Sequence, residues 1–196
     1  MGTKFSRKLL PAGVIVLFVT VASCLTGCLT DSKDGDKSTN VTTSWTMDSV
    51  LTVGAQGNVS YGTAIDLDKR RVLLSLAANA AQDSLDVLFA YHNSSFVLIA
   101  PRTAKDSGIT VAANYDTAKV QYVQFVKVET APANWDAGKV AYDAGVKVSY
   151  SPVAPGDIFV VKTTEGDYSL LTLMSINGST ATGSGVIKIN IKGMAH

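Results

Sequence analysis

Two pairs of closely spaced carboxylates are the first residues of this chain whose types and spacing could support chemistry. Asp66 and Asp68 are two positions apart, and Asp83 and Asp86 are three apart. Within a strand, alternate residues point to the same face, so Asp66 and Asp68 could together face a metal ion. Asp68, however, opens the polar sequence Asp-Lys-Arg, which is typical of a solvated turn. We therefore expect no metal site at these positions.

A second group of candidates consists of side chains that could contact a ligand: His92, Tyr91, Trp135 and Met174. His92 follows Tyr91 at a predicted hairpin turn, where a histidine is most often simply exposed. Trp135 could stack on a sugar or another flat ligand, or could belong to the core. Met174 lies in a predicted buried strand, where methionine usually fills a gap in the packing.

No sequence pattern of a known catalytic class accompanies these residues. The chain has no G-x-S-x-G nucleophile elbow, no H-E-x-x-H zinc pair and no phosphate-binding glycine loop. We expect a binding protein without catalytic activity rather than an enzyme.

The N-terminal segment has the features of an export signal. Lys4, Arg7 and Lys8 precede an apolar run over residues 9–21, and small residues follow it. This order is typical of a signal peptide. The run is also shorter than the roughly 20 residues that a membrane-spanning helix needs. We expect residues 1–27 to be removed as a signal peptide.

Cys28 is the predicted site of lipidation. The sequence Leu25-Thr26-Gly27-Cys28 resembles the lipobox of bacterial lipoproteins, in which a thiol receives a diacylglyceryl group and small residues allow the peptidase to bind an extended backbone. A third acyl chain, such as palmitate, would then modify the new N-terminal amine. Stable anchoring needs at least two chains, so Cys28 would hold the protein in the bilayer. Leu29 is not the aspartate of an inner-membrane retention signal, which favours the outer membrane and exposure at the surface.

The expected cleavage changes the charge balance of the chain and leaves one domain-sized segment. Processing before Cys28 removes three basic residues and no acid, which turns 17 basic and 16 acidic residues into a net charge of −2. This balance argues against a nucleic-acid partner. Residues 28–44 comprise the lipidated cysteine and a polar stretch that we interpret as a flexible tether. Residues 45–196 are long enough for a single domain with its own core.

The pattern of this domain predicts an all-β fold. Alternating or continuous apolar runs bounded by turn formers indicate strands, at the following positions: 50–53, 60–67, 72–76, 85–91, 96–100, 146–150, 157–163, 168–176 and 186–191. The two runs around His92 are apolar throughout, which predicts burial on both faces. Residues 120–128 favour a strand or irregular edge, with a helix as the alternative, and residues 134–144 favour a short helix capped by Asn134. A polar loop is expected from Asn177 to Gly185. We expect an antiparallel β-sandwich or partly open barrel built from hairpins, with at most one short helix.

Three stretches resemble conserved parts of the HmuY-type bacterial lipoproteins. They are Ala64-Ile65-Asp66-Leu67-Asp68, then Leu85-Asp86-Val87-Leu88-Phe89, and the hairpin sequence from Asp157 to Tyr168. The resemblance implies a lipid-anchored, extracytoplasmic β-domain that binds haem or another small apolar ligand. Leu85 replaces the tryptophan of the family pattern, and the lysine after Tyr168 is missing.

The resemblance also implies what a haem site would need. Members of the family hold the iron between two histidines or use methionines, whereas this domain has only His92 and the C-terminal His196, besides Met47, Met174 and Met194. The alternative is a structural or adhesive surface lipoprotein that binds a polysaccharide or another envelope protein.

Overall fold

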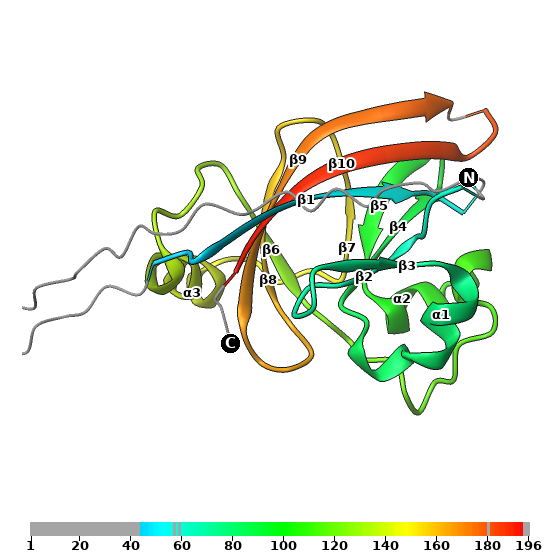
Figure 1. The fold of residues 1–196 in the computed structure, drawn as a ribbon, viewed down its shortest axis with the longest axis horizontal. Coiled ribbons are helices and arrows are strands. Elements are labelled where there is room, and N and C mark those ends of the chain that lie inside the picture. Colours follow the sequence, from blue (N-terminus) through cyan, green and yellow to red (C-terminus); the bar gives the residue numbers. More distant parts are fainter. Residues whose placement is uncertain (1–43, 57, 59, 180, 194–196) are drawn as a thin grey trace, which may run out of the picture. The chain divides into compact units, whose positions relative to one another are not determined.

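The computed structural model describes residues 44–193 apart from 57, 59 and 180, and these contain two antiparallel sheets of five strands each (Figure 1). Sheet A has the order β1 (Met47–Gly54), β10 (Ser184–Gly193), β9 (Tyr168–Ser179), β8 (Ile158–Lys162) and β6 (Phe125–Val128). Sheet B has the order β3 (Arg71–Leu73), β2 (Ala64–Asp66), β4 (Val87–His92), β5 (Ser95–Ile99) and β7 (Tyr150–Pro152). The predicted all-β, antiparallel class is confirmed.

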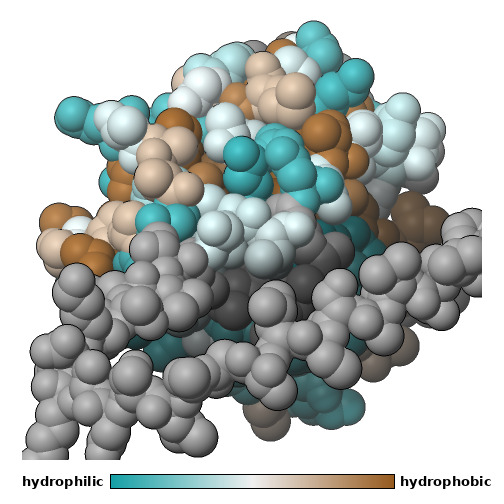
Figure 2. Space-filling model, turned by 60° about the vertical axis from the view of Figure 1, so that its left-hand side comes forward, coloured by the Kyte–Doolittle hydropathy of each residue, from teal (hydrophilic) through white to brown (hydrophobic). Residues whose placement is uncertain are grey.

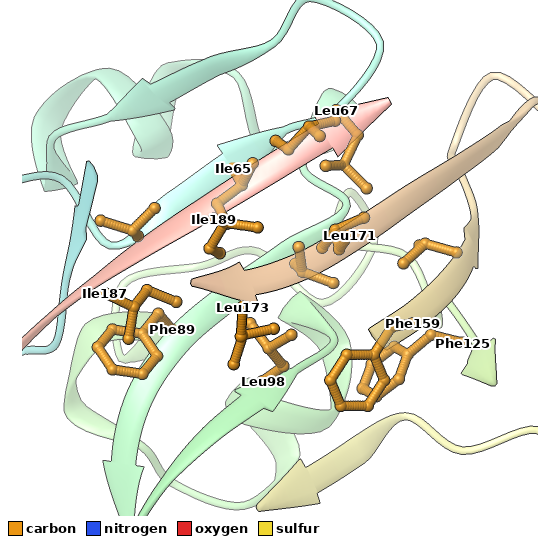
Figure 3. Close-up of a cluster of buried hydrophobic side chains, with 14 of the residues drawn as sticks. Ile65, Leu67, Phe89, Leu98, Phe125, Phe159, Leu171, Leu173, Ile187 and Ile189 are labelled. Carbon is orange, nitrogen blue, oxygen red and sulfur yellow. The ribbon is translucent and has the colours of Figure 1, made fainter. Parts of the chain in front are cut away.

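The main core lies between the two sheets, so the arrangement is sandwich-like. Figure 3 shows Ile65, Phe89 and Leu98 of sheet B meeting side chains of sheet A. The contributions of sheet A include Phe125, Phe159, Leu171, Leu173, Ile187 and Ile189, all of them almost or completely buried. Two of these rings, Phe125 and Phe159, pack edge to face with centroids 5.6 Å apart.

The outer face of sheet B is covered by helices, which explains the continuous apolar runs of β4 and β5. The covering elements are α1 (Ser75–Ala80), η1 (Gln82–Ser84), α2 (Pro101–Asp106) and η2 (Thr110–Ala112). Leu88, Val97 and Ile99 of the sheet pack against them in a second apolar cluster. Burial of these two strands on both faces is confirmed, because alternate residues meet the sandwich core and the helical layer.

Helix α3 (Trp135–Ala144) covers part of the outer face of sheet A. The Asn134 side chain accepts a hydrogen bond from the Ala137 amide at 2.8 Å, so the predicted N-cap is confirmed. Gly138 lets the helix lie close to Trp45, since a Cβ atom there would be 2.7 Å from the indole ring. The outer side chains of β6, β8 and β9 complete this third cluster.

Several predicted boundaries are wrong for local reasons. The loop predicted from Asn177 is instead strand, since β9 continues to Ser179 and Asn177 pairs with Val186. Gly178 permits this with a φ of 147° in direct contact with Gly185. The strand predicted over 72–76 ends at Leu73, and α1 follows it. The strand predicted over 60–67 is reduced to β2.

Two six-residue helices, α1 and α2, are present in addition to the one short helix expected. Pro101 follows β5 closely and supplies the first residue of α2, where its missing amide hydrogen has no cost.

None of the helices within the described residues is long and apolar enough to cross a membrane. The predicted signal peptide 1–27, the motif Leu25-Thr26-Gly27, the lipidation site Cys28 and residues 28–43 of the predicted tether lie outside the described residues. His196 and Met194 do so as well.

Candidate functional site

Tyr91 and His92 end strand β4 at one extremity of sheet B. The half-buried imidazole of His92 packs edge to face with Tyr150, at a centroid distance of 6.1 Å. Tyr91 packs on Phe96 at 5.4 Å. Its backbone amide donates to the Gln56 side chain at 2.7 Å. These two candidates are therefore neighbours held mainly by packing.

Trp135 and Met174 lie on other elements. Trp135 is the first residue of α3, and its ring packs edge to face on Tyr168 at 5.4 Å. Met174 is 53% exposed, so the prediction that it is buried is wrong. The pairing of β9 with β10 passes from Ser175–Lys188 to Leu173–Ile189, which leaves Met174 without a cross-strand partner at a bulge that turns it outward. The four predicted ligand residues therefore do not form one site.

A groove with a volume of about 480 Å³ opens between α3, the end of β8 and the segment before β6. Sequence reasoning did not assemble this site, because its walls come from four separate stretches of the chain. The lining residues are Gln121, Tyr122, Val123, Gln124, Tyr142, Asp143, Lys147, Lys162, Thr163, Thr164 and Tyr168.

Tyrosines and lysines give the groove its chemical character. Tyr142 and Tyr168 pack edge to face with centroids 5.3 Å apart. The Lys147 ammonium lies 5.1 Å from the centre of the Tyr142 ring and donates to the Asp143 carbonyl at 3.1 Å. Tyr122 is 61% exposed, and its hydroxyl donates to Asp106. Tyr142 and Tyr168 are buried, so Tyr122 supplies the exposed aromatic surface of the groove.

Charge in the groove is biased toward cations. Asp143 is paired with Lys139 at 3.3 Å, so its charge is partly compensated. Lys162 is exposed and forms no ion pair with any described residue. None of the described residues that line the groove is a histidine, cysteine or methionine. The lining suits a polar or anionic ligand better than a haem.

The face around α3 is chemically mixed. Figure 2 brings this side of the molecule forward and shows hydrophilic and hydrophobic residues interspersed among the coloured atoms. The face carries no single broad apolar area among the coloured residues that this view shows.

Three of the acidic residues singled out in the sequence meet behind the groove, where the two sheets adjoin. Asp66, Asp68 and Asp86 each have a carboxylate oxygen within 4.8 Å of the others. Asp66 and Asp86 are completely buried, and Asp68 is partly buried. The turn expected to begin at Asp68 is present, but Asp68 is only partly solvated, and Asp66 lies completely buried in β2. We call these three residues the carboxylate junction.

Protein donors already occupy the oxygens of two of these carboxylates. Asp86 accepts from the Leu67 amide at 2.7 Å and from the Thr164 amide at 2.6 Å. Asp66 accepts from the Lys69 amide, the Ser84 hydroxyl and the Arg71 guanidinium, the last at 2.9 Å. Asp66 and Asp86 therefore tie backbone turns together, whereas Asp68 keeps one buried carboxylate oxygen, Oδ2, without a hydrogen-bond partner among the described residues.

Burial also changes the acidity of the junction. Desolvation raises the pKa of Asp86 to about 7, against the lowering effect of its two backbone hydrogen bonds. Desolvation likewise raises the pKa of Asp68, with the charges of Glu165 and Asp66 acting in the same direction and a hydrogen bond to Thr163 opposing it.

The three stretches that carry the HmuY-type resemblance converge at this junction. Asp66 and Asp68 come from the first stretch, Asp86 from the second and Thr164 from the third. In this chain these residues fix turns, so the resemblance concerns residues that shape the fold rather than residues that would contact a ligand. Comparison with models of known families, with curated proteins and with solved structures gives no match.

Proposed function

We propose that this protein is a non-catalytic outer-membrane lipoprotein, anchored through acylated Cys28, whose β-sandwich binds an acidic glycan in the groove beside α3. The observation that carries the proposal is that one groove combines the exposed ring of Tyr122 and the exposed amides of Gln121 and Gln124 with Lys162, which forms no ion pair with a described residue. The lipid anchor rests on the sequence around Cys28.

The side chains of the groove match what a sugar presents. A tyrosine ring can lie against the apolar face of a pyranose, while its hydroxyl takes part in hydrogen bonding. Gln121 and Gln124 each offer an amide that can both donate and accept. A groove of about 480 Å³ is in the size range of small-ligand sites.

The lysines favour an acidic sugar over a neutral one. Lys162 and Lys147 lie at the same groove, and Asp143, the one acid among the described residues of its lining, is paired with Lys139. A ligand carboxylate or sulfate would gain charge-assisted hydrogen bonds from these ammonium groups.

The second candidate is a haem carrier of the HmuY type, for which the sequence resemblance and His92 are the grounds. His92 is half-buried beside the ring of Tyr150 at the end of sheet B, which would suit the edge of a flat ligand. Titration of the domain with haem tests this candidate, because ligation by His92 would shift the Soret band and His92→Ala would abolish the shift. An unchanged Soret band at micromolar concentrations contradicts it.

Binding to the groove can be tested with the mature domain, residues 28–196, carrying Cys28→Ser. We expect an oligogalacturonate to bind in calorimetry and a neutral dextran oligosaccharide of the same length to bind at least tenfold more weakly. Lys162→Ala should weaken oligogalacturonate binding about tenfold, which corresponds to about 1.4 kcal/mol. Lys188→Ala, which removes an exposed lysine of β10, is the matched control and should have no effect. Equal binding of both sugars, or equal loss in both variants, contradicts the proposal.

The anchor is tested separately in the full-length chain. Expressed in a Gram-negative host with labelled palmitate, the protein should carry label and sediment with outer membranes, and Cys28→Ser should lose both properties. Cys24→Ser is the control, because Cys24 lies before the predicted cleavage point. Label retained in Cys28→Ser would contradict lipidation at this residue.

A further inference from the structure

The carboxylate junction and the groove share the same turn of the chain. Thr163 and Thr164 line the groove. On the other side, the Thr164 amide donates to Asp86, and the Thr163 hydroxyl is hydrogen bonded to Asp68. Any change in how these carboxyl groups hold the turn is therefore transmitted directly to the groove wall.

We propose that Asp86 and Asp68 form a proton-sensitive latch that holds turn 163–167 of sheet A against turn 67–70 of sheet B and thereby sets the shape of the groove. The effect on ligand affinity rests on the proposed function, whereas the latch itself does not.

Asp86 is well placed to act as the latch because its own backbone is fixed. Its amide donates to the Ile65 carbonyl at 3.0 Å, immediately before β4 begins. One carboxyl oxygen then reaches Leu67 in sheet B's turn and the other reaches Thr164 in sheet A's turn. Hydrogen bonds within turn 163–167, such as Thr163 amide to Asp167 carbonyl at 2.8 Å, close the turn but do not connect it to sheet B.

The charged groups around Asp86 leave it without a cation of its own. From β2 and β3, Asp66 faces it, but Asp66 is paired with Arg71 and Lys69. From the two turns, the charged residues are Asp68, Lys69, Arg70, Glu165 and Asp167, of which Lys69 also lies 3.9 Å from Glu165. No ion pair to Asp86 is formed within the described part of the chain.

Protonation of Asp86 removes one negative charge from the junction, whose three carboxylate oxygens lie within 4.8 Å of one another. The pKa of Asp86 is about 7, so higher pH removes this proton and leaves uncompensated negative charges close together in a buried space. The repulsion is relieved when the two turns separate and water enters, which displaces Thr163 and Thr164.

The stability of the domain should follow the same titration. Because the pKa of Asp86 is about 7 when folded and its ordinary value is 3.8, the folded state binds the proton more tightly than the unfolded chain. The stability that protonation contributes is present at low pH and is lost as the pH rises toward 7. The free energy of unfolding should thus fall across this interval and level off above it.

The latch is tested by two-dimensional NMR of the Cys28→Ser domain between pH 5 and 8.5. We expect the Leu67 and Thr164 amide signals to titrate with one common midpoint near neutrality. Asp68→Asn should lower that midpoint, since it removes the neighbouring negative charge, and Asp86→Asn should abolish the titration. Asp83→Asn, the same change at an exposed acid three residues away, should leave it unaltered.

Ligand binding is measured in the same series. Oligogalacturonate affinity should be several-fold weaker at pH 8.5 than at pH 6 in the unaltered domain and should change less in Asp68→Asn. Amide signals that do not titrate, or a titration that survives Asp86→Asn, would overturn the latch. A millimolar Ca²⁺ addition that moves the same amides would overturn it in favour of a cation site. Titrating amides without sugar binding at any pH would uphold the latch and refute the proposed function.

Discussion

The carboxylate junction and the groove lie on opposite sides of one turn, yet they treat polar groups in opposite ways. At the junction, Asp66 and Asp86 are completely buried and their oxygens accept hydrogen bonds from backbone and side-chain donors. In the groove, Lys162 is exposed and has no ion-pair partner within the described residues, while the exposed Tyr122 donates its hydroxyl hydrogen to Asp106. Buried polar groups persist only when they are satisfied, whereas exposed groups remain free for a ligand.

This difference shows which polar residues to associate with ligand binding. The paired aspartates are the stronger signal of chemistry in the sequence, but in the fold their hydrogen bonds serve the backbone. The groove residues match no motif, but they include Lys162, an exposed cation without an ion pair among the described residues. Substitutions on the two sides of the turn should therefore differ in how strongly they lower the free energy of unfolding.

Asp86→Ala should have the largest effect on stability. It leaves the Leu67 and Thr164 amides without their acceptor in a buried environment, at about 1–3 kcal/mol each. We expect the free energy of unfolding in urea to fall by about 2–5 kcal/mol at pH 5. The loss should be smaller at pH 8, because ionisation of Asp86 has already weakened the unaltered protein. Asp83→Ala is the control, and an equal loss in both variants would show that the junction does not fix the turns.

Asn134→Ala should have an intermediate effect. The substitution removes the cap of α3, whose residues Tyr142 and Asp143 form one wall of the groove. We expect a loss of about 1 kcal/mol in the free energy of unfolding. Asn134→Ser keeps a capping oxygen and should lose much less. If both variants lose the same amount, the Asn134 side chain acts through something other than the cap.

Lys162→Ala should have the smallest effect on stability and thereby separates the two regions most sharply. An exposed lysine without an ion pair contributes little, so the free energy of unfolding should stay within about 0.5 kcal/mol of the unaltered value. The same variant is the one expected to weaken oligogalacturonate binding. A large loss of stability together with the loss of binding would mean that the groove, too, is a structural feature.

The local pattern of the chain was sufficient for much of the fold. Alternation and continuous apolar runs placed β1, β4, β5, β8, the first part of β9 and β10, because strand periodicity and burial act on neighbouring residues. Asn134 before an amphipathic stretch placed α3 for the same reason, since a cap needs only the next few amides. The lipobox around Cys28 depends on adjacent residues alone, and the prediction drawn from it awaits its own experiment.

Tertiary contacts decided the rest. The Asn-Gly pair at 177–178 is a turn signal, but pairing with β10 keeps it within a strand. The exposure of Met174 follows from a bulge that only the partner strand creates. The burial of Asp66 and Asp86 requires turns more than 75 residues apart to meet, as the separation of 78 residues between Asp86 and Thr164 shows. Local sequence specifies the geometry of each segment. Long-range packing decides which segments come together at one site. For this reason the sequence revealed the aspartates but not the groove.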